Sequence, residues 1–582
     1  MLLPKIKFTP LLKPLLAIIL ALSLLVRVWQ IDSTPPSLYW DEMDVGYQAY
    51  SILKTGKDYY GNYPFLVVHS FADFRAPVLI YITVPFVAIF GLTPLAVRLP
   101  EAVLGTLSVL LIYILTRQLF KSQKAALSAA LLTAFAPWSI QYSRIAYEAM
   151  LMLVVFLAGL IFFYKGLSKP KYLIISAALF SLDLFVYNTM KLFIPFIAAS
   201  LIAIYYKQLT LNRSSIIASM ILIISLTAGL YGTIFMNGGQ RFNEISIFTD
   251  PQNSKQVDYL RHNSQLSYND KPLIGETPRF FDRLFYNKPA LFIDRITQNY
   301  LTAFSSEFLF VKGDANLRHS TTIVGELYRI EALAIILGLG FLLINLKKNP
   351  RESLLIIIWV IIAPLAAIIT REGSNHATRL FMLFPALTIV GALGVEYLSQ
   401  ILPPKLRYYV LTLLFAVWLF CVGSFLNFYF GAYNLESAES FQFGFDEAVQ
   451  KATENKNRYD YVIIDDRTDS ALMNYLFLTK HDPALFHTQI STLKSDIAGF
   501  PGDQIDNVIL MKPLMKNWDN AFSINQFDQR YLLIVSAEQM SEQTPEKLYK
   551  KLSPNQTLID TIYYKSGLPA FYVISSQKPS QI

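Results

Sequence analysis

The chain has 582 residues, of which 53% are hydrophobic, 14% aromatic and 16% charged, and it carries a formal net charge of +8. Soluble domains carry roughly 25% charged residues, so this composition excludes an ordinary soluble protein and indicates a polytopic membrane protein. The single cysteine, Cys421, excludes an internal disulfide bond and a cysteine-based metal site.

The first long apolar run covers residues 11–31. It is long enough to cross the roughly 30 Å hydrocarbon core of a bilayer as a helix. A cleaved signal peptide is the alternative, but no small-x-small cleavage site precedes Asp32, and many further apolar runs follow. We therefore expect a membrane anchor here.

The basic residues lie in short clusters between the apolar runs, with hardly an acidic residue among them. This arrangement is typical of the cytoplasmic loops of a membrane protein and does not indicate a nucleic-acid partner. All the clusters can be cytoplasmic at once if the N-terminus is cytoplasmic and about eleven helices span the membrane. The predicted spans are residues 11–31, 95–117, 125–141, 148–165, 172–188, 192–206, 214–235, 326–346, 352–370, 379–398 and 408–430.

Residues 77–92 are also apolar, but the segment is short and contains Pro77 and Pro85. If it spanned the membrane, every later loop would be inverted and the basic clusters would lie outside. We expect this segment to lie along the outer interface or to re-enter the membrane.

Three substantial segments then face outward: residues 32–94, residues 236–325 and a polar tail over residues 431–582. We expect the first to be an outer loop with juxtamembrane helices and the second to be a large outer loop. Both belong to a predicted transmembrane catalytic domain over residues 1–430.

The tail contains β-type runs that are separated by helix-compatible stretches. The clearest of these runs are residues 459–464, 508–511 and 531–535. They predict that residues 431–582 form a soluble extracytoplasmic α/β domain.

Trp40-Asp41-Glu42 places two adjacent carboxylates just outside the first span. The same outer segment is rich in acids and tyrosines, a mixture that suits sugar recognition. A carboxylate within hydrogen-bond reach of an acceptor hydroxyl or amide can take its proton. The alternative is a solvated loop, which we favour for most of these acids but not for Asp41.

Arg144 and Glu148 lie four residues apart after the third span, so on a helix they would share one face. The pair could be a simple ion pair at the membrane edge. Alternatively, the guanidinium could hold a phosphate that Glu148 helps to orient.

His376 and Arg379 follow the ninth span and could face the same point. An arginine at a helix start near the interface could simply extend its head group to water. Since charges at the membrane edge are costly, a role in a binding site is the default hypothesis.

Common catalytic signatures are absent from the sequence, including the Walker loop, the Rossmann fingerprint, His-Glu-x-x-His and Gly-x-Ser-x-Gly. Nucleotide sugars are cytoplasmic, whereas the acids of this protein are predicted to face outward. A group donor used on that side would have to be carried by a lipid.

Several motifs carry a family resemblance: Trp40-Asp41-Glu42, then Arg75-Ala76-Pro77, then the run from Phe90 to Pro100. They resemble the N-terminal half of the GT-C glycosyltransferases, in particular the bacterial branch related to protein O-mannosyltransferases and the lipid A aminoarabinose transferase. Ser143-Arg144 with Glu148, and the segment from Tyr300 to Ser320, also resemble parts of these proteins.

The resemblance covers roughly residues 10–400 and implies a GT-C-type fold. It implies inverting transfer of a hexosyl or pentosyl group from a polyprenyl-phosphate carrier. The acceptor would be a protein, a lipid or a cell-envelope glycan on the outer face of the cell membrane.

The resemblance also implies roles for single residues. Asp41 would be the general base, and Glu42 could share or tune that role, because paired acids shift each other's pKa. Arg144 and Arg379 would bind the donor phosphate, with His376 as a weaker candidate for the same task.

One motif departs from the relatives. The aminoarabinose transferase has an acid near the end of the first loop, but here the acid is displaced by one position to Asp73. The displacement puts a metal or donor role for this acid in doubt. Asp73 is kept as a possible additional site acid, as is Glu148 because of its spacing from Arg144. Relatives differ in metal dependence, so a divalent metal is possible and no cofactor follows from the resemblance.

Three other interpretations remain open. An oligosaccharide-transferring or polymerising enzyme is the nearest alternative. A lipid-linked sugar transporter would be expected to carry its ionisable groups mid-span rather than at the outer ends. A binding protein that works through its tail would leave Asp41 replaceable.

Overall fold

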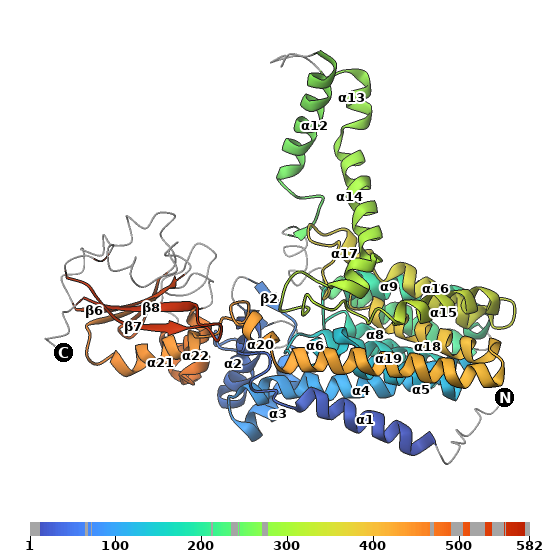
Figure 1. Cartoon of the computed structure of the whole chain (residues 1–582), viewed down its shortest axis with the longest axis horizontal. Coiled ribbons are helices and arrows are strands. Elements are labelled where there is room, and N and C mark those ends of the chain that lie inside the picture. Colours follow the sequence, from blue (N-terminus) through green and yellow to red (C-terminus); the bar gives the residue numbers. More distant parts are fainter. Residues whose placement is uncertain are drawn as a thin grey trace. The chain divides into compact units, whose positions relative to one another are not determined.

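In the computed structural model (Figure 1), the described residues are 12–63, 68–70, 73–210, 213–233, 243, 245–269, 278–465, 471–489, 504–511, 530–537, 552 and 555–576. The chain divides into two compact units. Unit 1 comprises Met1–Leu24, Gly105–Gln141 and Ala149–Gly423, and unit 2 comprises Leu25–Leu104, Tyr142–Glu148 and Ser424–Ile582.

Each predicted span contains a helix. These helices are α1 (Leu12–Val28), α4 (Pro94–Phe120), α5 (Gln123–Phe135), α7 (Ala149–Gly166), α8 (Lys171–Asp183), α9 (Met190–Leu209), α10 (Arg213–Thr233), α15 (Glu331–Asn345), α16 (Pro350–Ile362), α18 (Leu383–Ile401) and α19 (Pro404–Phe430). Within the described part of the chain, six helices are long and apolar enough to cross a membrane: Pro94–Phe120, Ala149–Gly166, Met190–Leu209, Pro350–Ile368, Leu383–Ile401 and Pro404–Phe430. The protein is therefore a multi-pass helical membrane protein.

Glycines allow helices of unit 1 to pack closely, as is common in membranes. A Cβ at Gly394 of α18 would lie 1.8 Å from the carbonyl oxygen of Ala334 in α15. A Cβ at Gly338 of α15 would lie 1.9 Å from the carbonyl oxygen of Val390 in α18. Both backbones approach too closely for any larger residue at these positions.

The third predicted span, residues 125–141, is not one continuous helix. Helix α5 ends at Phe135, Ala136 is extended, and Pro137 begins the short helix α6 (Pro137–Tyr142). Proline cannot donate the hydrogen bond that would continue a helix, and its ring clashes with the preceding turn. The ninth span breaks similarly at Pro364, after which α17 (Leu365–Ile368) begins.

In unit 2, the segment predicted to be the first outer one contains α2 (Trp40–Thr55), β1 (Val68–Ser70), β2 (Asp73–Arg75) and α3 (Val78–Phe90). The side chain of Glu42 accepts a hydrogen bond from the backbone N–H of Tyr39 at 3.0 Å, which caps the start of α2. Gly56 ends this helix with a φ of 73°. Helix α3 has 13 residues, fewer than the roughly 20 that a membrane-spanning helix needs.

The tail forms an α/β domain, as predicted. Its sheet has the strand order β4-β5-β3-β6-β8-β7, and β3 is parallel to both β5 and β6. The strands are β3 (Tyr461–Asp465), β4 (Gln504–Ile505), β5 (Val508–Met511), β6 (Tyr531–Ser536), β7 (Thr557–Tyr563) and β8 (Pro569–Ser575). The helices are α20 (Tyr433–Glu436), α21 (Phe445–Asn455), α22 (Ala471–Leu478) and α23 (Pro483–Gln489).

Within unit 2, α2 packs directly on the tail domain. A Cβ at Gly46 of α2 would lie 2.7 Å from the ring of Phe477 in α22. The Tyr47 hydroxyl donates a hydrogen bond to the carbonyl oxygen of His481 at 3.0 Å. The helix that carries Asp41 is therefore supported by the folded tail.

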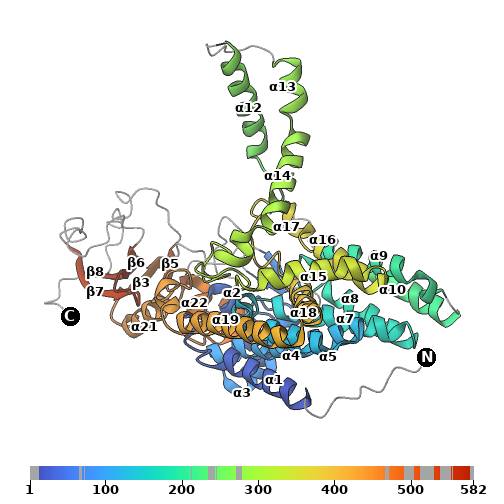
Figure 2. The ribbon, with the colours of Figure 1, turned by 45° about the vertical axis from the view of Figure 1, so that its right-hand side comes forward.

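The segment predicted to be the large outer loop belongs to unit 1 and contains a helical hairpin, drawn in green in Figures 1 and 2. Its elements are α12 (Gln252–Asn269), α13 (Phe280–Phe285), α14 (Lys288–Ala303) and the π-helix η2 (Glu307–Val311). At the base of the hairpin, the Asn299 side-chain amide donates to the carbonyl oxygen of Ile368 at 2.9 Å. This contact joins the hairpin to the end of α17.

Candidate functional site

Three carboxylates of unit 2 gather around one guanidinium, and we call Asp41, Asp44, Glu148 and Arg75 the acidic cluster. Arg75 forms ion pairs with Asp41, with Asp44 at 2.9 Å and with Glu148 at 3.5 Å. Arg75 also donates a hydrogen bond to the backbone oxygen of Asp41 at 2.8 Å. One cation therefore faces three anions.

Local structure explains this arrangement. Asp41 and Asp44 lie three residues apart on α2 and so share a face of that helix. The antiparallel pair β1–β2 brings Arg75 back to this face, and Ser70 of β1 donates to Asp44 at 2.8 Å. Glu148 arrives from the turn that follows α6.

The carboxylates differ in exposure. The side chain of Asp44 is 0% exposed and that of Glu148 is 12% exposed, whereas that of Asp41 is 34% exposed. Asp41 is therefore the member of the acidic cluster that solvent or a substrate can reach most easily.

Burial raises the pKa of Asp44 to about 6, although the charge of Arg75 opposes this shift. Burial also raises the pKa of Glu148, again against Arg75. One buried oxygen of Asp44, Oδ1, has no hydrogen-bond partner among the described residues. Burial acts to lower the pKa of Arg75, but the three carboxylates raise it above its ordinary value.

Glu42 lies in a different environment from its neighbour Asp41. Its side chain is 0% exposed and forms a two-fold contact with Arg98, at 2.8 Å and 3.0 Å. It also accepts the backbone N–H of Ala146 at 3.0 Å. Glu42 thus joins α2, α4 and the 142–148 segment, and this placement indicates a positioning role.

Arg144 is also buried, and its guanidinium is directed at the C-terminal end of α1. It donates hydrogen bonds of 2.7–3.2 Å to the carbonyl oxygens of Val26, Arg27, Gln30 and Thr34. Such a contact satisfies carbonyl groups that have no partner at a helix end. A role in phosphate binding would require Arg144 to leave these carbonyl oxygens.

The expectation that Arg144 and Glu148 share a helical face is wrong. Helix α6 ends at Tyr142 and α7 begins at Ala149, so the segment between them is not helical. In this turn Arg144 contacts α1, whereas Glu148 contacts Arg75. Because residues 143–148 are not helical, a spacing of four residues does not place the two side chains on one face.

Asp73 lies on β2, where its backbone pairs with Ser70. Its side chain lies outside the described part of the structure.

Arg75 belongs to the motif Arg75-Ala76-Pro77 that carries the family resemblance, but no functional role was predicted for it. It is the single arginine in residues 32–94, a segment that holds six acidic residues. This imbalance is a signal that could have identified it.

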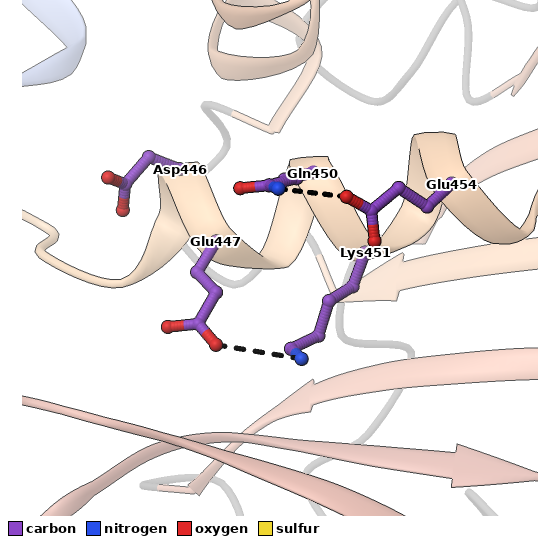
Figure 3. Close-up of a pocket in the computed structure, with 5 residues that line it drawn as sticks. All are labelled: Asp446, Glu447, Gln450, Lys451 and Glu454. Atoms are coloured by element: carbon purple, nitrogen blue, oxygen red, sulfur yellow. Dashed lines mark hydrogen bonds and ion pairs between the residues drawn. The ribbon is translucent and has the colours of Figure 1, made fainter.

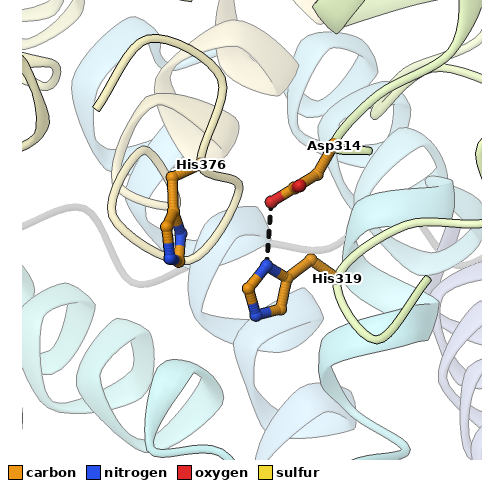
Figure 4. Close-up of side chains that lie close together, drawn as sticks. All are labelled: Asp314, His319 and His376. Carbon is orange, nitrogen blue, oxygen red and sulfur yellow. Dashed lines mark hydrogen bonds and ion pairs between the residues drawn. The ribbon is translucent and has the colours of Figure 1, made fainter. Parts of the chain in front are cut away.

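Unit 1 contains a second group, which we call the histidine cluster: Asp314, His319 and His376. The imidazole Nδ1 of His319 lies 2.8 Å from Oδ2 of Asp314, and the rings of His319 and His376 are 4.7 Å apart (Figure 4). Burial lowers the pKa of His376, and the positive charge of Arg379 adds to this effect.

Arg379 and His376 are the two residues of this region that were predicted as site residues, whereas Asp314 and His319 were not. Arg379 donates to the Thr370 hydroxyl at 2.9 Å and lies 3.9 Å from the Glu372 carboxylate. Its side chain is 14% exposed. The charge of Arg379 acts on the pKa of His376, and a shared site for the two residues stays a prediction.

A surface pocket lies on α21 of the tail domain (Figure 3). It is lined by Asp446, Glu447, Gln450, Lys451 and Glu454. Lys451 lies 3.6 Å from Glu447, and Gln450 donates to Glu454 at 2.8 Å. These contacts are typical of a solvated helix face.

The fold is that of a multi-pass membrane protein, and its acidic cluster is built around α2. A family model described as Dolichyl-phosphate-mannose-protein mannosyltransferase (PMT_2) matches residues 74–231. No curated protein matches the chain by sequence.

The chain is similar to several solved structures at low sequence identity. ArnT from Cupriavidus metallidurans in the apo state matches with a TM-score of 0.51 and 12% identity, covering 97% of this chain and 99% of that chain. The same protein bound to undecaprenyl phosphate matches with a TM-score of 0.48 and 13% identity, covering 98% of this chain and 99% of that chain. A third match is the oligosaccharyltransferase AglB from Archaeoglobus fulgidus, in complex with an inhibitory peptide and a dolichol-phosphate. Its TM-score is 0.45 and its identity 14%, and the match covers 91% of this chain and 70% of that chain.

The chain therefore shares the fold of ArnT, and residues 74–231 are similar to the dolichyl-phosphate-mannose-protein mannosyltransferases.

Proposed function

We propose that the protein transfers a sugar from a polyprenyl-phosphate-linked donor to an acceptor on the outer face of the membrane. ArnT, which shares the fold, has been observed with undecaprenyl phosphate. The absence of nucleotide-binding motifs from the sequence supports the same class of donor.

Asp41 is the proposed general base. The observation that carries this proposal is the acidic cluster, in which one guanidinium serves three carboxylates and Asp41 is the most exposed of them. Arg75 orients the Asp41 carboxylate, and the buried Asp44 and Glu148 hold Arg75. A general base must be oriented and reachable, and Asp41 meets both requirements.

In the proposed step, the acceptor oxygen or nitrogen forms a bond to C1 of the donor sugar. The bond between C1 and the phosphate oxygen breaks, and the lipid phosphate leaves with the electron pair. Asp41 receives the proton of the acceptor. Attack from the face opposite the leaving group inverts the configuration at C1.

The departing phosphate carries negative charge, which needs electrostatic stabilisation as the bond breaks. We propose Arg379 for this role, with His376 as its neighbour. Its guanidinium donates to the Thr370 hydroxyl at 2.9 Å and lies 3.9 Å from the carboxylate of Glu372.

The proposed topology places the N-terminus in the cytoplasm and the tail domain outside. A reporter that is active only outside the cytoplasm, fused after residue 431, should be active. Activity of a cytoplasmic reporter at this position would overturn the orientation and with it the outer site.

The experiment that tests the function is mass spectrometry of envelope glycans and lipids in a deletion strain. Wild-type protein should restore a glycosylated product, and the mass difference should identify the sugar. Asp41→Asn should restore none of it, whereas Asp32→Asn, which changes an exposed acid of the same segment, should restore it fully. Identical glycans and lipids with and without the protein would refute the proposal.

A further inference from the structure

The histidine cluster places three metal-ligating side chains within reach of one another. One ligand atom from each of Asp314, His319 and His376 lies within 4.8 Å of the other two. In a tetrahedral zinc site with bonds of 2.0–2.2 Å, ligand atoms are about 3.3 Å apart. Small side-chain rotations would therefore bring all three atoms onto one ion.

A second observation concerns His376 itself. Its Nδ1 is buried and has no hydrogen-bond partner among the described residues. Buried polar nitrogen atoms are normally satisfied, and an orphaned one calls for an explanation such as an ion. In Figure 4 the His376 ring lies beside the pair formed by Asp314 and His319.

Local hydrogen bonds fix the backbone around the histidine cluster. Asp314 Oδ2 accepts the N–H of Ala377 at 2.9 Å, which ties the two loops together next to His376. Asp314 Oδ1 accepts the N–H of Asn316 at 2.9 Å. Gly313 has a φ of 76°, and a Cβ there would lie 2.3 Å from the Ser320 hydroxyl, so this turn requires glycine.

We propose that Asp314, His319 and His376 bind a divalent transition-metal ion, with Zn²⁺ as the preferred ion. Two imidazole nitrogens and one carboxylate oxygen suit zinc, whereas Mg²⁺ and Ca²⁺ prefer sites made of oxygen alone. Three protein ligands leave a fourth position for water or an anionic oxygen, as in open zinc sites.

The charge environment limits the affinity. Arg379 places a positive charge near His376, which disfavours a dication, but it also favours the neutral imidazole that a metal requires. We therefore expect weaker binding than in a closed structural zinc site.

The test uses the full-length protein in detergent, stripped with a chelator and then dialysed against Zn²⁺ or Co²⁺. The wild type should bind about one ion per chain by elemental analysis, and the Co²⁺ form should show the intense visible absorption of a tetrahedral site. His319→Ala and His376→Ala should each weaken binding at least about 10-fold.

His262→Ala is the matched control, because His262 lies on the exposed surface of α12. This variant should bind as the wild type does. If an alanine variant elutes as aggregate, His376→Asn keeps a polar side chain and tests the same ligand. The proposal is overturned if the stripped wild type takes up neither ion, or if folded His319 and His376 variants bind as tightly as the wild type.

Discussion

Asp41 and Glu42 are adjacent on α2, and each contacts an arginine, yet they belong to two different kinds of region. Glu42 and Arg98 form a sealed pair in which both side chains are 0% exposed. In the acidic cluster, three carboxylates share Arg75, and Asp41 is 34% exposed. The ratio of acids to cations and the exposure of the acid, rather than the type of residue, separate a structural ion pair from a candidate site.

The largest effect is predicted for a substitution of Arg75, the cation at the centre of the acidic cluster. Arg75→Ala removes the cation shared by three carboxylates, so we expect transfer activity to fall at least about 100-fold. Arg75→Lys should recover only part of the activity, since an ammonium group cannot make the same forked contacts. The measurement is the initial rate with purified protein and its lipid-linked donor.

Lys54→Ala is the matched control, because Lys54 is an exposed cation on α2, the helix that carries Asp41 and Asp44. It should leave the rate unchanged. Wild-type activity in folded Arg75→Ala would show that the acidic cluster is dispensable.

The second prediction breaks the sealed pair. Glu42→Gln leaves the Arg98 charge buried without its partner, which should destabilise the protein by about 3–5 kcal/mol. Asp41→Asn removes a more exposed partner of Arg75 and should lower the free energy of unfolding by no more than about 1 kcal/mol. Thermal unfolding of both variants in detergent measures the contrast.

The folded fraction of Glu42→Gln should retain transfer activity, because Glu42 belongs to the structural ion pair with Arg98 and not to the acidic cluster. Equal melting temperatures for the two variants would remove the distinction between the sealed pair and the acidic cluster.

The smallest predicted effect is a pH dependence caused by Asp44. Its pKa is raised from 3.8 to about 6 by burial, so the folded state retains the proton to higher pH than the unfolded state does. Stability contributed by this protonated group is present below about pH 4 and is lost as the pH rises to about 6. The loss amounts to about 3 kcal/mol at most.

Asp44→Asn has no proton to lose, so its melting temperature relative to that of the wild type should rise between pH 4 and pH 6 and then level off. Asp32→Asn, which changes an exposed acid, should show no such trend. If the difference in melting temperature between wild type and Asp44→Asn did not change with pH, this would contradict the raised pKa of Asp44.

Much of the fold could be predicted from the sequence because its signals are local. Long apolar runs located the membrane helices, and the β-type run at residues 459–464 located β3 (Tyr461–Asp465). Trp40-Asp41-Glu42 was recognisable because one short motif carries both acids. The break at Pro137 is also a local signal, and its effect on the third span was missed.

The contacts of the candidate site could not be predicted, because they join residues that are distant in sequence. Arg75 reaches Asp41 only through the β1–β2 pair, and Arg144 reaches Arg27 only through the fold of unit 2. The histidine cluster likewise joins His319 to His376 across several helices. No periodicity in the sequence encodes such contacts.

The most direct test of Asp41 as the general base separates donor binding from transfer in purified full-length protein. We predict that Asp41→Asn binds the lipid-linked donor about as well as the wild type and melts within a few degrees of it, but transfers sugar at least about 100-fold more slowly. Near wild-type transfer by this folded variant would contradict the assignment of Asp41 as the general base.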